Sequence, residues 1–237
     1  MDKTMDYQIY HLNGLEYDLN TDLGKICMEM IALRIGGYYK YYGNKLMPLD
    51  LYDHFSNHIV LSKKIGNEFK LIACVRYISL SRCVENDFVF LPLSRISSTS
   101  NAELEHHINH LITNNKNESN DFIYNSGLTI HPSLTCSKEK RLVIKYIVGA
   151  ALNCHKSAGN REFIISAIGK VKTDRLFSKL GFKPVCANPY YVYKGLESEQ
   201  FMILMFDGGN DLSEEWIEGT KKLWNTRFEF ERQEMVV

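Results

Sequence analysis

Apolar residues along the chain recur at two spacings, one typical of strands and the other of helices. Residues 163–168 form an apolar run of strand length, and Leu176 and Leu180 then follow at helical spacing. Gly181 ends this helical pattern, as a glycine just after the last apolar residue of a helix commonly does. The stretch 163–182 therefore predicts a strand that leads into a short helix.

Both patterns recur elsewhere and predict a chain that mixes strands and helices. Helical spacing predicts further helices over 22–42, 101–112, 138–156 and from Ser213 onward. Apolar runs predict strands over 58–61, 71–80, 122–130, 190–192 and 201–206. Three other segments complete the prediction: a polar lead-in over 1–20, a loop over 81–87, and a short strand or loop edge over 88–91. Because glycine weakens helices, Gly36 and Gly37 should end or bend the first helix.

Length and composition fit one globular domain spanning residues 1–237, with 207–237 as a C-terminal helical extension. The chain is 45% hydrophobic and has no Pro/Gly/Ser-rich linker that would divide it. Its formal net charge is zero, which disfavours nucleic acid and anionic membranes as partners. No apolar run reaches the roughly 18 residues of a membrane span. The six cysteines lack any framework spacing, so we expect reduced thiols in a cytoplasmic protein.

His106 and His110 are four residues apart on one predicted helix face, which is the spacing of two zinc ligands. His107 stands where the H-E-x-x-H motif has its glutamate, and no third ligand is evident. Solvated surface histidines are the favoured interpretation. We therefore predict no metal site.

Two features of the middle of the chain point to ligand chemistry. Gly127 lies inside a predicted strand, where glycine often marks a bulge or the close approach of a ligand to the backbone. The helix that follows begins with three cations, Lys138, Lys140 and Arg141, although the helix dipole disfavours positive charge there. Either an anionic ligand binds at this helix start or the three charges are simply solvated.

The order of these elements, with a helix that closes on LFSKLGFKPV, resembles the GNAT acyltransferase superfamily over roughly residues 20–206. The resemblance implies an α/β (α+β) fold with a mixed, mostly antiparallel central sheet, helices on both faces and a C-terminal helix. It also implies that the strand 122–130 binds the pantetheine of an acyl thioester through backbone groups of Gly127, Leu128, Thr129 and Ile130.

The chain departs from two GNAT motifs. Where the superfamily has R/Q-x-x-G-x-G/A for the pyrophosphate, this chain has Thr135, Lys138 and Lys140 in place of the arginine and both glycines. The lysines would then bind phosphate by charge, or the donor presents the single phosphate of an acyl carrier protein. Where many members use a tyrosine to protonate the departing thiolate, this chain has Phe177, which has no proton to donate.

A second resemblance is to the acyl-homoserine lactone synthase and N-acyl amino acid synthase branch of the superfamily. It lies in the first third of the chain, in Arg34, Tyr38, the pair Asp50 and Asp53, and Arg76. In that branch the acidic pair and the strand arginine shape the amine acceptor site. The E-x-S-R-L motif of the branch is represented by YNSGL at 124–128, without its glutamate and arginine. The acidic pair also fits an N-capping or solvated role.

The resemblance assigns roles for amide formation from a thioester. Asp53 is the first choice of general base and Asp50 the second. Backbone N–H groups near Gly127 would stabilise the oxyanion. Arg34, Tyr38 and Arg76 would bind the acceptor, and Arg76 would orient a carboxylate. Ser126 and His131 are candidates for proton relay.

We therefore expect an N-acyltransferase that acts on a small amine or amino acid. Its co-substrate would be acyl-CoA or acyl-phosphopantetheine on acyl carrier protein, with no permanently bound cofactor. The alternative is a GNAT-fold protein that binds a ligand or partner without catalysis.

Overall fold

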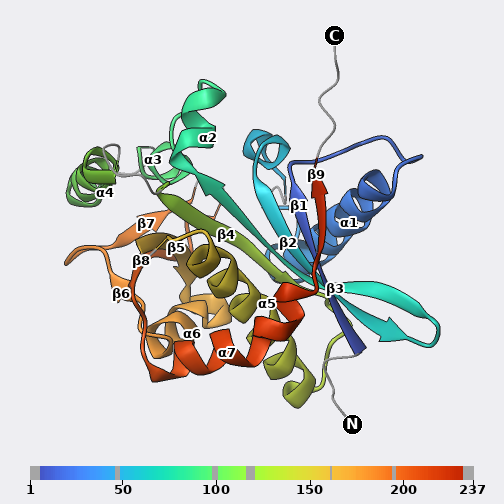
Figure 1. Ribbon diagram of the computed structural model, residues 1–237. Helices are drawn as coiled ribbons and strands as arrows, with labels where there is room; N and C mark the ends of the chain where they lie inside the picture. The colour runs from blue at the N-terminus through green and yellow to red at the C-terminus, as the bar shows by residue number, and fades with distance from the viewer. Residues whose placement is uncertain are drawn as a thin grey trace. The chain divides into compact units, whose positions relative to one another are not determined.

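The computed structural model describes residues 6–45, 49–97, 101–115, 121–160, 162–193 and 196–231 (Figure 1). Residues 1–5 of the predicted lead-in and 232–237 of the predicted C-terminal extension lie outside these ranges. Within the described ranges, no helix combines the length and apolar character that crossing a bilayer requires.

Strands and helices of the described chain follow one another in a mixed order. The strands are β1 (Tyr7–Asn13), β2 (Asn57–Ile65), β3 (Glu68–Ser79), β4 (Ile123–Ile130), β5 (Glu162–Ile168), β6 (Lys183–Pro184), β7 (Tyr190–Val192), β8 (Gln200–Asp207) and β9 (Phe228–Glu231). The helices are α1 (Asp22–Tyr42), α2 (Leu80–Glu85), α3 (Leu91–Ile96), α4 (Ala102–Asn115), α5 (Ser137–Ser157), α6 (Thr173–Lys179) and α7 (Asp211–Asn225), with 3₁₀ turns η2 (Leu51–His54) and η3 (Gly169–Val171).

The strands form a mixed sheet in the order β6-β8-β5-β4-β3-β2-β1-β9, with β7 also paired to β8. The pairs β1–β2, β5–β8, β6–β8 and β7–β8 are antiparallel. The pairs β1–β9 and β4–β5 are parallel. The predicted fold class, a mostly antiparallel sheet flanked by helices with a helix near the C-terminus, is confirmed.

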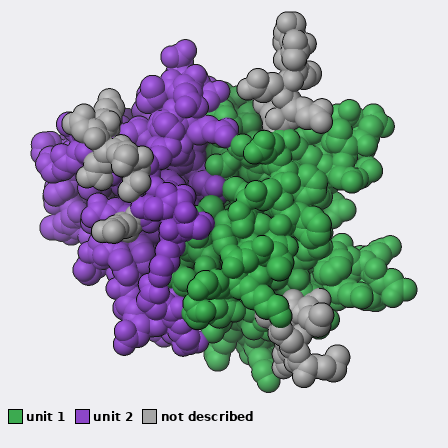
Figure 2. All heavy atoms as spheres, viewed as in Figure 1, with its two compact units in different colours: residues 1–76, 127–154, 216–237 green, residues 77–126, 155–215 purple. Residues whose placement is uncertain are grey.

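The chain groups into two compact units (Figure 2). Unit 1 contains residues 1–76, 127–154 and 216–237, and unit 2 contains 77–126 and 155–215. Strands β3 and β4 contribute residues to both. The single domain predicted for residues 1–237 stays a prediction.

Helix α1 forms the core of unit 1 together with the first strands. Thr21 caps its start, because the Thr21 side chain accepts a hydrogen bond from the Gly24 N–H. Its inner face buries residues such as Cys27 and Met30 against Leu12 of β1 and Val60 of β2. This apolar stripe, read from the sequence at helical spacing, fixes the face of the helix that meets the sheet.

Gly36 and Gly37 do not end α1, which continues to Tyr42, so the expected helix end was wrong. A Cβ on Gly37 would lie 2.4 Å from Thr129 Cγ2 of β4. The helix therefore keeps a glycine there because its backbone packs closely on β4, and tertiary packing outweighs the weak helix propensity.

Two adjacent alanine substitutions should have opposite effects on stability. Gly37→Ala should lower the free energy of unfolding by about 1–3 kcal/mol, because its new methyl group overlaps Thr129. Gly36→Ala should raise it by about 0.5–1 kcal/mol, because its Cβ would meet Pro132 Cγ at an ordinary 3.6 Å and the helix propensity improves. Urea unfolding of both variants measures the difference. Equal effects would contradict the close α1–β4 packing.

Four short elements differ from the sequence-based expectations. The predicted lead-in contains β1, whose buried and half-buried residues pair with β2. The predicted loop and strand edge over 81–91 instead contain the one-turn to two-turn helices α2 and the start of α3. β9, which pairs with β1, was not predicted. The helices α2 and α3 and the strand β9 are too short to show a hydrophobic period, and β1 carries polar residues such as Gln8, His11 and Asn13 that mask its apolar positions, so pairing and packing determine these conformations.

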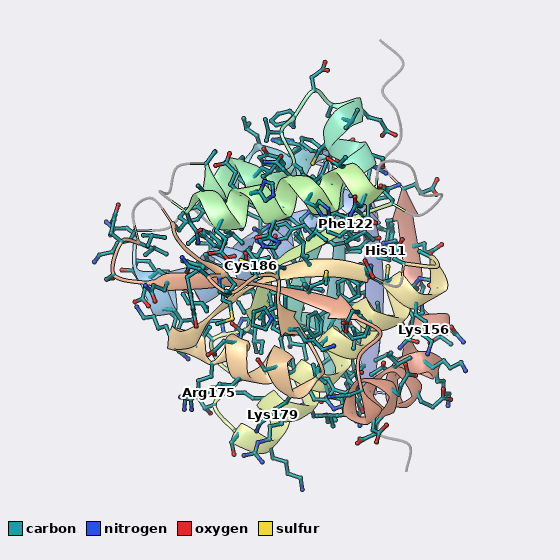
Figure 3. All side chains as sticks on the ribbon, turned by 90° about the vertical axis from the view of Figure 1, so that its left-hand side faces the viewer. His11, Phe122, Lys156, Arg175, Lys179 and Cys186 are labelled. Atoms are coloured by element: carbon teal, nitrogen blue, oxygen red, sulfur yellow. The ribbon has the colours of Figure 1, made fainter. Side chains whose placement is uncertain are left out.

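In unit 2, β5 leads through η3 into α6 as the stretch 163–182 predicted. Helix α6 buries Phe177, while Arg175 and Lys179 lie on its outer side (Figure 3). Gly181 takes a positive φ of 89°, and a Cβ there would lie 2.9 Å from the backbone of Gly209. Glycine at this helix end is thus required both by the turn and by the neighbouring chain.

Candidate active site

Asp50 precedes the 3₁₀ turn η2 and Asp53 lies within it, and together the two residues form a reciprocal cap. The Asp50 carboxylate accepts the N–H of Tyr52 at 3.1 Å, and Asp53 Oδ2 accepts the N–H of Asp50 at 2.8 Å. The spacing D-x-x-D matches the geometry of a capping box. The capping role that the sequence left open is therefore real, and it fixes both carboxylates in place.

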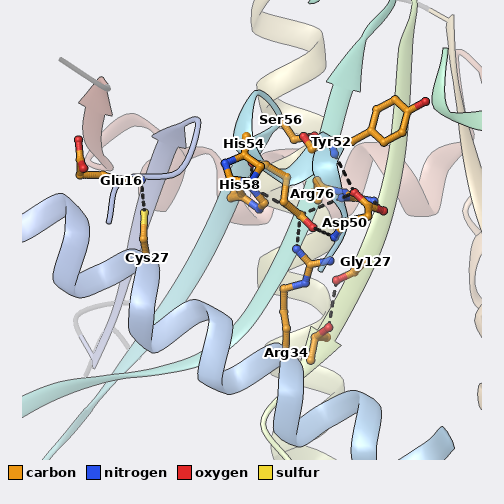
Figure 4. Close-up of polar contacts among 12 residues, drawn as sticks. Glu16, Cys27, Arg34, Asp50, Tyr52, His54, Ser56, His58, Arg76 and Gly127 are labelled. Carbon is orange, nitrogen blue, oxygen red and sulfur yellow. Dashed lines mark hydrogen bonds and ion pairs between the residues drawn. The ribbon is translucent and has the colours of Figure 1, made fainter. Parts of the chain in front are cut away.

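Two arginines from distant segments bind this acidic pair (Figure 4). Arg34 of α1 donates through Nη1 to Asp53 Oδ1. Arg76 of β3 donates to both oxygens of Asp50, at 2.6 and 3.1 Å, and its Nη1 lies 2.8 Å from Asp53 Oδ1. Four of the residues predicted for the acceptor site thus form one ion cluster within unit 1.

Burial differs sharply between the two carboxylates. The Asp53, Arg34 and Arg76 side chains are 1%, 3% and 2% exposed, whereas the Asp50 side chain is 31% exposed. Buried charges need partners, and here each arginine faces a carboxylate. Asp50 is therefore the carboxylate of the cluster that solvent and a substrate can reach.

The charges of the cluster shift one another's pKa values. Burial alone would raise the pKa of Asp53, but Arg76 and Arg34 hold it far below its usual range. Burial would lower the pKa of Arg34, yet Asp53 raises it above its usual value. Asp53 is therefore a carboxylate at all physiological pH values and a weak base.

His58, on β2, is a buried member of the cluster that sequence reasoning missed. Its Nε2 lies 3.3 Å from the main-chain oxygen of Asp53, which makes Nε2 the protonated nitrogen. Burial, opposed by Asp53 and reinforced by Arg34, lowers its pKa to about 3. His58 is therefore neutral, and its hydrogen bond to the main chain of Asp53 stabilises the turn η2.

His58 should make the protein sensitive to mild acid. A buried histidine with a lowered pKa adds stability above its unfolded pKa of about 6.5, and this stability is lost as the pH falls toward 3. Between pH 7 and pH 5 the loss should be about 2 kcal/mol in the free energy of unfolding. His58→Gln keeps an N–H donor without this titration and should remove that loss. Urea unfolding at both pH values tests it; an unchanged pH dependence in the variant would contradict it.

Gly127 of β4, which was predicted to bind the donor, lies beside the arginines (Figure 4). Its φ is 67°, so it departs from extended strand geometry. A Cβ there would lie 3.5 Å from Arg34 Nη2 and 3.7 Å from the hydroxyl of Tyr38. The Gly127 carbonyl accepts the Thr129 hydroxyl at 3.0 Å. The structure thus brings Gly127, Thr129 and Tyr38 together with the ion cluster.

Comparison with known proteins identifies the fold. No protein-family model and no curated protein sequence matches the chain. The acyl-homoserine lactone synthase LasI aligns with 90% of this chain and 94% of its own, at 15% identity and a TM-score of 0.51. The CoA-dependent acyl-homoserine lactone synthase BjaI, solved with MTA and with SAM and isopentyl-CoA, aligns with 97% of this chain and 95% of its own. Its TM-score is 0.53 and its identity 12% and 11% in the two structures.

The chain has a GNAT-like fold. The resemblance read from its sequence is confirmed at the level of the fold.

In this GNAT-like fold, helix α5 begins with the predicted basic residues. Lys138 and Arg141 are exposed and Lys140 is half-buried. Glu139 between them does not neutralise them, because it pairs with Lys63 of β2 at 2.5 Å. The excess positive charge at the start of α5 is therefore available to an anion.

Cys136 immediately precedes the first residue of α5. The nearby backbone N–H groups of Glu139 and Lys138 lower the pKa of its thiol. The side chain is exposed. The Cys136 thiol therefore ionises more readily than an ordinary cysteine, which the sequence T-C-S-K-E-K did not reveal.

The remaining residues predicted for the site lie outside the ion cluster and the start of α5. His131 Nδ1 bonds with the Ser133 hydroxyl at 2.7 Å, and its main-chain N–H donates to Ile72. Leu128 and Ile130 complete the half-buried end of β4 in unit 1. Ser126 is buried and belongs to unit 2.

No group of histidine, cysteine, aspartate or glutamate side chains in the described residues is arranged to hold a metal ion. His106 and His110 are on α4, as predicted, and the His110 ring bonds with Asn114.

Two residues at the candidate site, His58 and Cys136, were not predicted from the sequence. His58 begins an apolar strand, where a histidine carries no spacing signal. Cys136 resembled the other scattered thiols.

Proposed function

We propose that this protein is an N-acyltransferase that moves an acyl group from a thioester to a small amine. The observation that carries the proposal is Asp50, a half-exposed carboxylate held by both donor nitrogens of Arg76 at the edge of a buried ion cluster. A fixed carboxylate that faces solvent can bind an ammonium group and take its proton.

The burial of Asp53 changes the order of the two candidate bases. Asp53 is bound by two arginines and almost fully buried, which suits it to position its neighbours. We therefore propose Asp50 as the base and Asp53 as the residue that orients Arg34 and Arg76. Since Arg76 already donates to both carboxylates, we also propose that it positions Asp50 and does not orient a substrate carboxylate.

The proposed reaction is a direct displacement. Asp50 removes a proton from the amine, and the amine nitrogen forms a bond to the thioester carbonyl carbon. The carbonyl becomes an oxyanion that backbone N–H groups near Gly127 stabilise. The oxyanion collapses, the carbon–sulfur bond breaks, and the thiolate leaves and takes a proton from solvent. Ser126 and His131 stay candidates for proton relay.

We propose that Lys138, Lys140 and Arg141 bind the phosphate of the donor. Their charge is not cancelled by Glu139, which is paired with Lys63. Acyl-CoA and acyl carrier protein both present a phosphate and a pantetheine thioester, so both are candidate donors. The six free cysteines suit a cytoplasmic protein.

The decisive experiment is a thiol-release assay. Purified protein is incubated with short- and long-chain acyl-CoA and acyl carrier protein donors and with a mixture of amino acids, and the products are identified by mass spectrometry. Release of thiol together with an N-acyl product supports the proposal. Absence of both with every donor overturns it.

A second candidate is a protein that binds the thioester without transferring its acyl group. Cys136 favours it, because its exposed thiol lies beside the backbone N–H groups of Lys138 and Glu139, which would otherwise be open to phosphate. Buried Phe177, in place of a tyrosine acid, agrees with it. Tight donor binding without thiol release would support this candidate.

A further inference from the structure

Helix α1 carries a second apolar stripe on the side that faces away from its core. Met28, Ile35 and Tyr39 are 41%, 50% and 69% exposed, and Ala32 is also exposed. With half-buried Tyr42, these residues follow one another in steps of four, three, four and three. The stripe is therefore distinct from the buried face that contains Cys27, Met30 and Arg34. We call these five residues the outer seam.

Steps of four and three residues are the spacing at which one helix packs along another. Apolar residues at this spacing form one contiguous stripe along the helix, whereas apolar residues scattered singly over a surface would need no explanation. Ala32, near the middle of the outer seam, has a small side chain that lets a second helix approach. Tyr39 has a large side chain that can fill the space above a small residue of that helix. The outer seam therefore has the pattern of a helix-pairing surface.

The charges beside the outer seam indicate which helix fits it. Glu29 and Lys40 are exposed on one flank, eleven positions apart. In an antiparallel pair of identical helices, Glu29 of each copy would face Lys40 of the other when the two-fold axis passes between positions 34 and 35. The outer seam, from 28 to 42, is centred on position 35. The two centres differ by half a residue, or about 0.75 Å along a helix that rises 1.5 Å per residue, so the charges and the apolar residues specify nearly the same axis.

We infer that the protein forms a two-fold dimer through antiparallel pairing of α1 with α1 of a second copy. Ile35 meets its own counterpart near the axis and Met28 meets Tyr42, while small Ala32 lies within one residue of the position that faces large Tyr39. Lys40 also donates to the Pro132 carbonyl at 2.9 Å within its own chain, which leaves two of its three N–H groups for Glu29. Such self-complementarity is the signature of a closed dimer interface.

An anionic membrane surface fits the outer seam less well. Glu29 and Asp22 lie on α1 together with Lys25 and Lys40, and Asp22 already pairs with Lys25 at 3.3 Å. A membrane-binding helix instead carries an excess of cations on its polar face. The mixed charge favours a protein helix of the same composition.

The test is the oligomeric state of the full chain as a function of concentration. Sedimentation velocity from about 1 to 200 µM should show a reversible dimer, since a single helix pair buries a small interface. Ile35→Glu places two like charges near the axis and should raise the dissociation constant by at least about tenfold. Ile65→Glu is the matched control, because Ile65 is 52% exposed at the end of β2, away from the outer seam. It should leave the dimer unchanged.

Charge reversal tests the orientation. Glu29→Lys and Lys40→Glu should each weaken the dimer, and the double variant should restore it, because the pairs then form with opposite sign. A monomer at every concentration, a dimer insensitive to Ile35→Glu, or a double variant as weak as the singles overturns the inference. So does binding of a monomer to phosphatidylcholine/phosphatidylserine vesicles that is lost in Ile35→Glu. Circular dichroism verifies that each variant is folded.

Discussion

Replacing Asp53 by asparagine is expected to lower the free energy of unfolding by about 3–5 kcal/mol. The substitution keeps the shape of the side chain but leaves Arg34 and Arg76 buried without their shared carboxylate. Removing one partner of a buried ion pair costs far more stability than the intact pair contributes, because the remaining buried charge is left without an opposite charge. Urea unfolding at pH 7 measures the loss.

Asp22→Asn is the control for this prediction. Asp22 also pairs with a cation, Lys25, but both side chains are exposed, and such pairs contribute only about 0–1 kcal/mol. Acid should reproduce the Asp53 effect. Its pKa is depressed, so the stability that Asp53 adds is present above its unfolded pKa of about 3.9 and is lost as the pH falls below it. Similar losses for the two variants at pH 7 would contradict the buried cluster.

Replacing Asp50 by asparagine is expected to reduce acyl transfer at least about 100-fold while the fold persists. The asparagine oxygen can still accept the N–H of Tyr52 and so keep the cap, but the amide cannot take a proton from the amine. Donor affinity should stay within about twofold, because Asp50 lies apart from the basic start of α5 in the proposed scheme. Thiol release measured against donor concentration separates kcat from KM.

Asp22→Asn again provides the control, since it removes an exposed carboxylate of unit 1 that has no proposed role. Its turnover should equal that of the parent protein. Full turnover in Asp50→Asn would remove Asp50 from the role of base. A raised KM for the donor with unchanged kcat would place Asp50 at the donor instead.

The fold was largely predictable because its long elements have clear periods. The pattern over 22–42 gave α1 and the pattern over 138–156 gave α5, each within about two residues at its ends. The failures have one physical cause. Gly36 and Gly37 have poor helix propensity, yet α1 passes through them because its backbone packs against Thr129. Long-range contacts of this kind leave no local signal in the sequence.

The candidate site was predicted in its members but not in its arrangement. The spacing of Asp50 and Asp53 suggested both a cap and an acceptor site, and the structure shows that one turn makes the cap and the ion pairs together. Which carboxylate is exposed depends on the packing of η2 between α1 and β3, so the sequence could not rank the two bases. The neutral state of His58 likewise depends on burial alone.

The parallel pairing of β9 with β1 has a consequence for synthesis of the chain. Residues 10–13 of β1 pair with residues 228–231, so one edge of β1 lacks this partner until residues 228–231 have left the ribosome. The ion cluster, in contrast, needs only the first 76 residues. A nascent chain can thus build its charged centre early while it still exposes an open strand edge, which is a template for aggregation. Truncation before residue 228 removes β9 and should therefore lower the soluble yield, because this edge of β1 then stays open.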